Sequence, residues 1–566
     1  MTMDRLEDLR DEIFAALARG DETGARKGIK RLRRREPIEA AGLLTALHIE
    51  AGRVREALAA WRECAKYAPR DPYTIFLRAR IYLLAGERSA ALDLLTPLLD
   101  AEMSPAIAEK VYNLAGQCAR FLGRAADAVR FYERARDAAP DLALRALNAS
   151  NVLFNRHYLP STCAEDKRAA EEYGALFSDV RPFDHGAHRR GERLRIGYLS
   201  PDVREHVVLS FSYALMTALD SARFEVTVYA LNPEDAYTEN VKRSVDHFRN
   251  LSRVSTEEAA HTIFRDGIDI LVDLAGHTAG RTLPILAYHP APVQISQIAA
   301  YKPAPVQISG IGYFASTGLR AVDYFLADPI LAAGDAEHGF TEELLVLPQT
   351  HFCWQPLHTG SVPKHLMTAG RPIVFGSFNN FTKLGDDVLA AWAEILHRVP
   401  ESRLFLKTDV FSYADARAEA MRRLAAPGIP LGRVDTEGAS RDYLAAYNHV
   451  DIALDPFPYP GGGTTCDALY MGVPVVTLAG ESLGSRFGAS LVENVGAGAL
   501  VARTLEEYVD RAVSLANDVD LLDALHAGLR QMMENSPVMN VAGYGAAVGA
   551  AYEQVWAVYE HERNCR

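Results

Sequence analysis

A glycine-rich stretch in the C-terminal half carries residue types suited to binding an anion. It reads Asp455-Pro-Phe-Pro-Tyr-Pro-Gly-Gly-Gly-Thr-Thr-Cys-Asp467 and follows an apolar run at 450–454 that predicts a buried strand. Its successive glycines let the backbone come close to a ligand. Thr464 and Thr465 add hydroxyls and amides where a helix is expected to begin, and helix N-termini favour anions. The stretch predicts a nucleotide-pyrophosphate loop, with an ordinary strand-to-helix turn as the alternative.

Length and composition set the broad class of the protein. At 566 residues the chain has room for three or four domains with sizeable cores. A net charge of −13 argues against nucleic acid as the main partner. No apolar run reaches about 18 residues and no N-terminal targeting segment is recognisable, so no membrane span is expected. The six cysteines are scattered without a C-x-x-C pair, which suits a reducing compartment and argues against a cysteine-built zinc site. We therefore expect a cytoplasmic protein.

Residues 1–180 repeat at about the tetratricopeptide period and carry almost no strand signal. Four glycines are each followed five residues later by an alanine: Gly20 and Ala25, Gly52 and Ala57, Gly86 and Ala91, Gly123 and Ala128. The pattern predicts a helix, a glycine turn and a second helix whose small alanine packs against the first. Units of this kind stack into a solenoid with a concave groove. An irregular helical bundle is the alternative.

Two series of β-branched and apolar runs alternate with helical segments after residue 190. Such runs predict parallel sheets covered by helices, with functional groups gathered beyond the carboxyl ends of the strands. Two successive lobes imply a cleft between them, near His206, His277, Lys383 and the glycine-rich stretch. The predicted strands are 194–200, 224–230 and 268–274 in the first series, and 372–378, 403–407, 450–454 and 475–478 in the second.

Six motifs occur in a fixed order along these lobes. They are Gly197-Tyr-Leu-Ser-Pro-Asp202 with His206, Asp273-Leu-Ala-Gly-His-Thr278, Pro303-Ala-Pro-Val-Gln307, Gly376-Ser-Phe-Asn-Asn-Phe-Thr-Lys383, the stretch 455–467, and Gly480-Glu-Ser-Leu-Gly-Ser-Arg486. Taken together, they resemble the O-GlcNAc transferase and SPINDLY group of glycosyltransferases, glycosyltransferase family 41. The resemblance covers nearly the whole chain.

The resemblance implies an α/β fold class with an N-terminal all-α superhelix. A tetratricopeptide-repeat solenoid is expected over residues 1–180, followed by a GT-B fold of two Rossmann-like lobes. The N-terminal lobe is expected over 190–365 and the C-terminal, nucleotide-sugar-binding lobe over 366–535. A C-terminal helix over 536–566 is expected to pack back on the N-terminal lobe.

Two residues match the family's catalytic positions. His206 resembles the histidine beside the donor sugar, where an imidazole can accept a proton or orient the acceptor hydroxyl. Lys383 resembles the lysine that contacts the pyrophosphate, where a fixed ammonium stabilises the negative charge that develops on the leaving nucleotide diphosphate.

Further residues match the donor-binding positions of the family. Thr464 and Thr465, with the amides after Gly462, resemble the diphosphate cradle. Asp467 is expected to accept from ribose hydroxyls or to orient Lys383. Asn380 stands where close relatives carry a glutamine. The full set expected at the nucleotide sugar is Asn380, Lys383, Arg441, Tyr443, Gly462, Gly463, Thr464, Thr465, Asp467, Gly312, His277 and Gln349.

The resemblance implies a direct, inverting displacement at the anomeric carbon without a metal or other cofactor. Metal-dependent glycosyltransferases usually present an Asp-x-Asp pair on a loop. The candidate here is Asp518-Val-Asp520, which lies in a helical region and is interpreted as a solvated helix face. No metal site is therefore expected.

One segment departs from the family pattern. His289-Pro-Ala-Pro-Val-Gln-Ile-Ser-Gln-Ile-Ala-Ala-Tyr301 is followed at once by a second, similar copy at 302–314. Either copy could fill the strand, leaving the other to bulge, and Gly310 and Gly312 make the second copy the better loop for an active site. A tolerated surface insertion, a reshaped acceptor site and an impaired enzyme are the three interpretations.

The leading hypothesis is a glycosyltransferase that moves GlcNAc from UDP-GlcNAc to Ser or Thr of a protein or peptide held in the repeat groove. Another donor, such as GDP-fucose or UDP-glucose, or a bacterial surface protein such as flagellin as acceptor, is the enzymatic alternative. A repeat scaffold with decayed catalytic lobes is the alternative of another class. The repeat domain is also a candidate homodimer interface.

Overall fold

The computed structural model describes residues 4–18, 21–281, 295–358, 360 and 371–565. The described residues form two compact units. One contains the helical region up to Asn155 together with Gly280, Arg281 and Val410–Met421. The other contains the remaining described residues from Arg156 onward, and with them both β-sheets.

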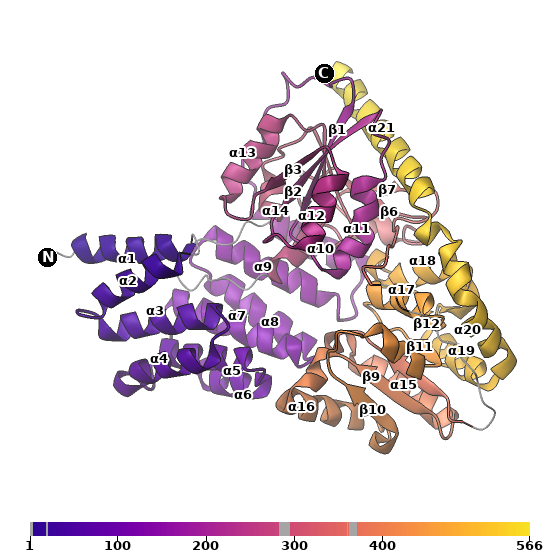
Figure 1. Ribbon diagram of the computed structural model, residues 1–566, viewed down its shortest axis with the longest axis horizontal. Coiled ribbons are helices and arrows are strands. Elements are labelled where there is room, and N and C mark those ends of the chain that lie inside the picture. Colours follow the sequence, from indigo (N-terminus) through magenta and orange to yellow (C-terminus); the bar gives the residue numbers. More distant parts are fainter. Residues whose placement is uncertain (1–3, 19–20, 282–294, 359, 361–370, 566) are drawn as a thin grey trace. The chain divides into compact units, whose positions relative to one another are not determined.

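The helical region consists of antiparallel helix pairs (Figure 1). Gly52, Gly86 and Gly123 lie in the turns within three of these pairs at φ of 70°, 85° and 75°, a conformation that glycine adopts without strain. The four alanines of the repeat pattern are all 0 % exposed. The helices are α1 (Asp4–Ala18), α2 (Glu22–Leu32), α3 (Pro37–Glu50), α4 (Val54–Tyr67), α5 (Pro72–Leu84), α6 (Arg88–Leu95), α7 (Pro105–Phe121), α8 (Ala125–Ala138) and α9 (Leu142–Arg156).

The first lobe of the second unit is a parallel sheet in the order β3-β2-β1-β4-β5-β6-β7. The chain runs outward from β1 to β3 and then returns to β4 on the other side of β1. Ligands bind at such a switch point, beyond the strand carboxyl ends. The strands are β1 (Leu194–Ser200), β2 (Phe224–Ala230), β3 (His247–Asn250), β4 (Ile270–Asp273), β5 (Val306–Ser309), β6 (Tyr324–Ala327) and β7 (Glu343–Val346). The helices are α10 (Cys163–Ala175), which precedes the sheet, α11 (Val207–Thr217), α12 (Ala236–Ser244), α13 (Thr256–Asp266) and α14 (Ile295–Ala300).

The second lobe repeats this plan with the parallel strand order β10-β9-β8-β11-β12-β13. Its switch point lies between β8 and β11, whose carboxyl ends lead to residues 378–383 and to the glycine-rich stretch. The strands are β8 (Val374–Ser377), β9 (Arg403–Lys407), β10 (Val434–Glu437), β11 (Ile452–Leu454), β12 (Val475–Leu478) and β13 (Val501–Ala502). The helices are α15 (Asp386–Arg398), α17 (Gly463–Tyr470), α18 (Phe487–Asn494), α19 (Leu505–Asn517) and α20 (Val519–Glu534). Helix α16 (Ala414–Ala425) comes between β9 and β10 in the chain, and most of it belongs to the first unit.

The predicted fold class is confirmed: a helical N-terminal region precedes two parallel sheets in a GT-B-like arrangement. All seven predicted strands are present, three of them shortened by two or three residues. The edge strands β3 and β10 were not predicted, because their residues are mostly polar and remain partly or fully exposed. Edge strands of this kind carry no hydrophobic signal that would separate them from loops. The prediction also lacked β6, β7 and β13, which are only two to four residues long.

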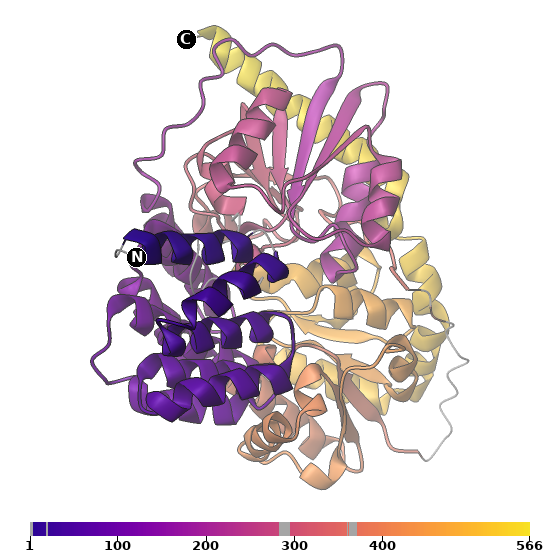
Figure 2. The same ribbon diagram turned by 60° about the vertical axis from the view of Figure 1, so that its left-hand side comes forward.

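The C-terminal helix α21 (Val541–Cys565) runs along the first lobe (Figures 1 and 2). The hydroxyl oxygens of Tyr552 and of Tyr198 in β1 lie 3.3 Å apart. Arg563 Nη1 donates to the His188 carbonyl at 2.8 Å. A Cβ on Gly545 would lie 2.2 Å from the Ala218 carbonyl oxygen, so glycine permits this close packing. Among the described helices, none combines the length and apolarity that crossing a membrane requires.

The two copies of the duplicated segment adopt different structures. The second copy supplies β5, which pairs with β4 in the register Ile270↔Val306. In the first copy, residues 289–294 lie outside the described residues and Ile295–Ala300 form α14. Ile298 is 0 % exposed and belongs to the core beneath α13, so this part of the first copy is not a surface bulge.

Glycine explains why the second copy occupies the strand. A Cβ on Gly312 would lie 2.1 Å from the Leu274 carbonyl oxygen, and one on Gly310 would lie 2.9 Å from Leu326 Cβ. The first copy has Ala299 and Gln297 at the equivalent positions. Both side chains would clash if the first copy were placed in the sheet.

Replacement of Ile298 by alanine is expected to lower the free energy of unfolding by about 2–5 kcal/mol, because it leaves a cavity in the core. Urea denaturation followed by circular dichroism measures this change. Val346→Ala is the matched control in the same lobe, since Val346 is 45 % exposed, and its expected effect is within about 0.5 kcal/mol. Equal stability of the two variants would contradict a role of Ile298 in the core and would favour the interpretation of the first copy as a tolerated insertion.

Candidate active site

The glycine-rich stretch forms a closed loop before α17. Asp455, 1 % exposed, ties the loop together: its Oδ1 accepts from the Gly461 amide at 2.7 Å and its Oδ2 accepts from Thr477 Oγ1 at 2.8 Å. Burial raises the pKa of Asp455 to about 6. The loop therefore depends on a buried carboxylate whose role is not evident from the sequence pattern.

Lys383 lies against this loop. Its Nζ donates to the Pro460 carbonyl at 2.7 Å and to Asn379 Oδ1 at 3.3 Å, and it lies 4.5 Å from the centre of the Tyr459 ring. Asn379 Oδ1 also accepts from Thr464 Oγ1 at 3.0 Å. The predicted Lys383 and Thr464 are thus brought together through Asn379, which was not among the predicted site residues.

Asn380, the predicted neighbour of the diphosphate, has a different local role. Its side chain caps the 3₁₀ turn Phe381–Lys383, with Oδ1 accepting from the Thr382 amide at 3.1 Å and from Thr382 Oγ1 at 3.0 Å. Asn380 is exposed, whereas Asn379 is buried. Asn380 therefore shapes the turn that carries Lys383, and its contact with the donor stays a prediction.

Tyr443 and Asp467 form a pair beside the loop. The Tyr443 hydroxyl is hydrogen-bonded to the Asp467 carboxylate. Burial raises the pKa of Asp467 to about 7, and the bond from Tyr443 partly opposes this rise. Close by, the Tyr447 hydroxyl donates to the Thr464 carbonyl at 3.0 Å. The predicted Arg441 is exposed, two residues before Tyr443.

His206 caps the N-terminus of α11 in the first lobe. Its Nδ1 lies 3.3 Å from the Val208 amide nitrogen and 3.3 Å from Asp202 Oδ1. The next residue, Val207, faces the glycine loop of the second lobe: a Cβ on Gly463 would lie 2.3 Å from Val207 Cγ2. The absence of a side chain at Gly463 thus lets the His206 loop approach the N-terminus of α17.

Comparison with known proteins decides the family. The profile of glycosyl transferase family 41 matches residues 175–299 and 361–548, which is more than half of the chain. This chain belongs to glycosyl transferase family 41. The first matched segment ends at residue 299, within the tandem duplication. The two segments include His206, Lys383, Thr464 and Asp467.

Relatives and a solved structure agree with this family. The chain is 37 % identical over 375 residues to a probable UDP-N-acetylglucosamine–peptide N-acetylglucosaminyltransferase, SPINDLY, of Arabidopsis thaliana, covering 65 % of this chain and 40 % of the relative. Its counterpart in Hordeum vulgare is also 37 % identical, covering 65 % and 38 %. A mutant O-GlcNAc transferase of Thermobaculum terrenum superposes with a TM-score of 0.73 at 27 % identity, covering 99 % of both chains. The chain thus spans about two fifths of the length of the plant relatives.

Of the other predicted donor residues of this family 41 chain, His277 and Gly312 are buried, whereas Gln349 is exposed. His277 is 2 % exposed; its ring packs edge-on against Tyr173 and Tyr313, and its Nε2 lies 3.1 Å from the Thr317 carbonyl oxygen. The need for glycine at position 312 is explained by the Leu274 carbonyl just after β4, which leaves no room for a Cβ. Donor contacts of these three residues stay predictions.

No metal-ligating cluster occurs in the described part of this family 41 chain, because its His, Cys, Asp and Glu side chains do not gather in threes. Asp518 instead caps α20, accepting from the Leu521 amide at 3.0 Å. The expectation of a metal-independent reaction stays a prediction.

Proposed function

We propose that this protein is an inverting, metal-independent glycosyltransferase that transfers GlcNAc from UDP-GlcNAc to serine or threonine hydroxyls of a protein acceptor. The observation that carries the proposal is the linked group of Lys383, Asn379 and Thr464 at the N-terminus of α17. An ammonium, a hydroxyl and helix amides in one place suit a diphosphate. The names of the plant relatives support UDP-GlcNAc as donor and a peptide as acceptor.

In the proposed reaction, the acceptor oxygen attacks the anomeric carbon from the face opposite UDP. The bond from that carbon to the β-phosphate oxygen breaks, and its electron pair leaves with UDP. Lys383 and the amides at the start of α17 stabilise the charge on the departing diphosphate. His206 receives the hydroxyl proton or orients the hydroxyl.

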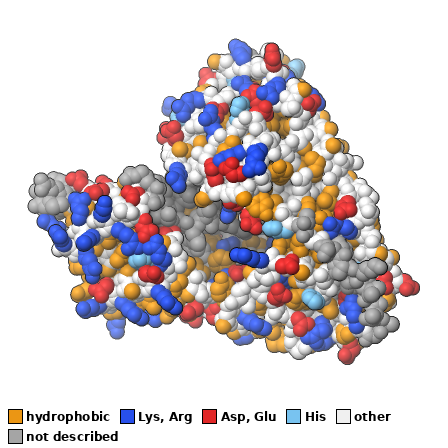
Figure 3. Space-filling model, viewed as in Figure 1, with side chains coloured by type: hydrophobic (Ala, Val, Ile, Leu, Met, Phe, Trp, Pro, Cys, Tyr) orange, Lys and Arg blue, Asp and Glu red, His pale blue; other side chains and the backbone are white. Residues whose placement is uncertain are grey.

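A groove in the helical unit supports capture of a peptide. It encloses a cavity of about 490 Å³ whose walls include Asn113 and Gln117. Gln117 Nε2 donates to Asn113 Oδ1, and Asn113 Nδ2 donates to Asn148 Oδ1, both at 2.6 Å. Side-chain amides can donate to and accept from a peptide backbone. Basic and acidic side chains are interspersed on the face shown in Figure 3, which suits a protein acceptor better than a polyanion.

Thermal scanning with UDP-GlcNAc, UDP, GDP and GDP-fucose tests the donor. Stabilisation by the uridine compounds alone, by about 2.7 kcal/mol at 100 times Kd, is the expected result. A shift with guanosine compounds alone would favour the GDP-fucose alternative, and no shift with any nucleotide would favour the impaired scaffold. Transfer to acceptor peptides, followed by intact mass, should continue unchanged in EDTA; its loss would contradict the metal-independent mechanism.

A further inference from the structure

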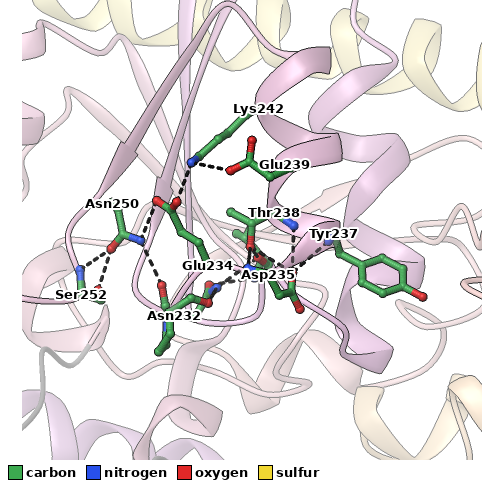
Figure 4. Close-up of polar contacts among 11 residues, drawn as sticks. Asn232, Glu234, Asp235, Tyr237, Thr238, Glu239, Lys242, Asn250 and Ser252 are labelled. Carbon is green, nitrogen blue, oxygen red and sulfur yellow. Dashed lines mark hydrogen bonds and ion pairs between the residues drawn. The ribbon is translucent and has the colours of Figure 1, made fainter.

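The loop that carries His206 is held by side chains from the neighbouring β2–α12 connection. This loop, residues 201–206, lies beyond the end of β1, where no sheet partner can satisfy its backbone. We propose that Asn232, Asp235 and Thr238 are positioning residues that fix this loop and thereby place His206 for transfer. The proposal rests on the proposed function of His206. Figure 4 shows these three side chains converging at the start of α12.

Asn232 and Thr238 hold the middle of the loop at Val203. Asn232 Oδ1 accepts from the Val203 amide at 3.0 Å, and Asn232 Nδ2 donates to the Val203 carbonyl at 3.0 Å. Thr238 Oγ1 donates to the same carbonyl at 2.6 Å. Asn232 is 3 % exposed and Thr238 is 0 % exposed. Both polar backbone groups of Val203 are therefore satisfied away from water, which makes displacement of the loop costly.

Asp235 connects the loop to helix α12. Its Oδ1 accepts from the amides of Tyr237 and Thr238, both at 2.9 Å, which caps the helix. Its Oδ2 accepts from the Glu205 amide at 2.7 Å. Burial would raise the pKa of Asp235, but the amides of Glu205, Thr238 and Tyr237 outweigh it and lower the pKa below its ordinary value. One ionised carboxylate thus serves both the helix and the loop.

Fixing the loop also affects His206, because His206 directly follows Glu205 in the chain. With Val203 and Glu205 fixed, His206 enters α11 with its Nδ1 3.3 Å from Asp202 Oδ1, a residue of the same loop. An error of about 1 Å in the placement of a reacting group can cost about 10²-fold in rate. The clamp can therefore affect transfer without contacting either substrate.

Asp235→Asn separates the two roles of the carboxylate. An amide can still cap α12 through its oxygen, but its NH₂ group then faces the Glu205 amide, and two donors cannot bond. We expect kcat for transfer to fall by about 10–100-fold with Kd for UDP changed by no more than about twofold. Hydrogen exchange of the peptide covering 201–206 should become faster. Thr238→Val, which keeps the side-chain shape and removes the bond to Val203, should act in the same direction.

Asp518→Asn is the matched control, because Asp518 also caps a helix but contacts no catalytic loop. Because asparagine can still cap the helix, we expect a smaller loss of thermal stability than in Asp235→Asn and an unchanged kcat. A normal kcat in both Asp235→Asn and Thr238→Val, or an equal loss in Asp518→Asn, would overturn the proposal. Unchanged exchange of 201–206 would also overturn it, and this readout holds even if the wild-type protein transfers no sugar and the proposed function itself fails.

Discussion

Replacement of Lys383 by alanine is expected to lower kcat for transfer by about 10²–10³-fold, equivalent to roughly 3–4 kcal/mol of transition-state stabilisation. The ammonium lies at the glycine loop, bonded to the Pro460 carbonyl and to the Asn379 that also holds Thr464. Charge builds on the diphosphate mainly as the glycosidic bond breaks. The loss should therefore appear in kcat, with Kd for UDP changed by no more than about tenfold.

Single-turnover assays with UDP-GlcNAc and an acceptor peptide, together with calorimetric titration of UDP, separate the chemical step from binding. Lys66→Ala is the matched control, because Lys66 Nζ also lies over a tyrosine ring, 5.6 Å from the centre of Tyr67, but at an exposed position of α4 in the helical unit. That variant should retain full kcat. Transfer by Lys383→Ala within a few-fold of wild type would remove the lysine from the leaving-group role.

Replacement of Asp467 by asparagine is expected to stabilise the ligand-free protein at pH 8 and to weaken nucleotide binding. The folded pKa of about 7 lies above the ordinary value of 3.8, because the carboxylate is buried. As pH rises from about 4 to about 7, the unfolded chain ionises first, so this group progressively reduces stability and the full loss persists above pH 7. Replacement by asparagine should therefore raise the free energy of unfolding by an amount on the order of 1–4 kcal/mol at pH 8 and leave it unchanged near pH 4.

The effect on binding should have the opposite sign. If ionised Asp467 accepts from ribose hydroxyls, the affinity of the wild-type protein for UDP should rise as pH passes through about 7. Asp467→Asn should bind UDP about 10–100-fold more weakly, with no such rise. Tyr443→Phe is the informative partner, because loss of its hydrogen bond should move the transition to higher pH. Equal melting temperatures at pH 8 and parallel affinity profiles for wild type and Asp467→Asn would contradict this prediction.

The sequence predicted the longer buried strands, because buried parallel strands are continuous apolar runs. The strands at 224–230 and 403–407 are examples. It missed the short strand β6, although that strand is also mostly buried. It could not predict β3 at His247–Asn250, where only position 248 is even partly buried and no periodicity marks a strand. Nor could it decide which copy of the duplication enters the sheet. That choice depends on how closely Gly312 approaches the Leu274 carbonyl, and the two residues are far apart in the sequence.

Within the site, motif resemblance selected Lys383 and Thr464, and the fold places them in one network. Neighbouring positions were harder, because Asn379 and Asn380 are chemically identical and only the turn decides which faces inward. His277 was expected at the donor, yet aromatic rings cover it. Asp455 and Asp235 were not selected because their roles depend on backbone amides of Gly461 and Glu205, which leave no trace in residue identity.

Because the segment is duplicated, the chain contains two similar sequences that could form β5 in the sheet of the first lobe. During folding, either copy can approach β4 before the tight contacts of Gly310 and Gly312 are tested. The chain thus contains a segment that can compete for this strand, and the close contacts at Gly310 and Gly312 favour the second copy, because a Cβ at either position would clash. Substitution of either glycine would therefore strain the native register and reduce the difference in free energy between the two registers. Conversely, substitutions in the helix-forming copy can make it less able to pair with β4. Each such substitution would increase the preference for the native register.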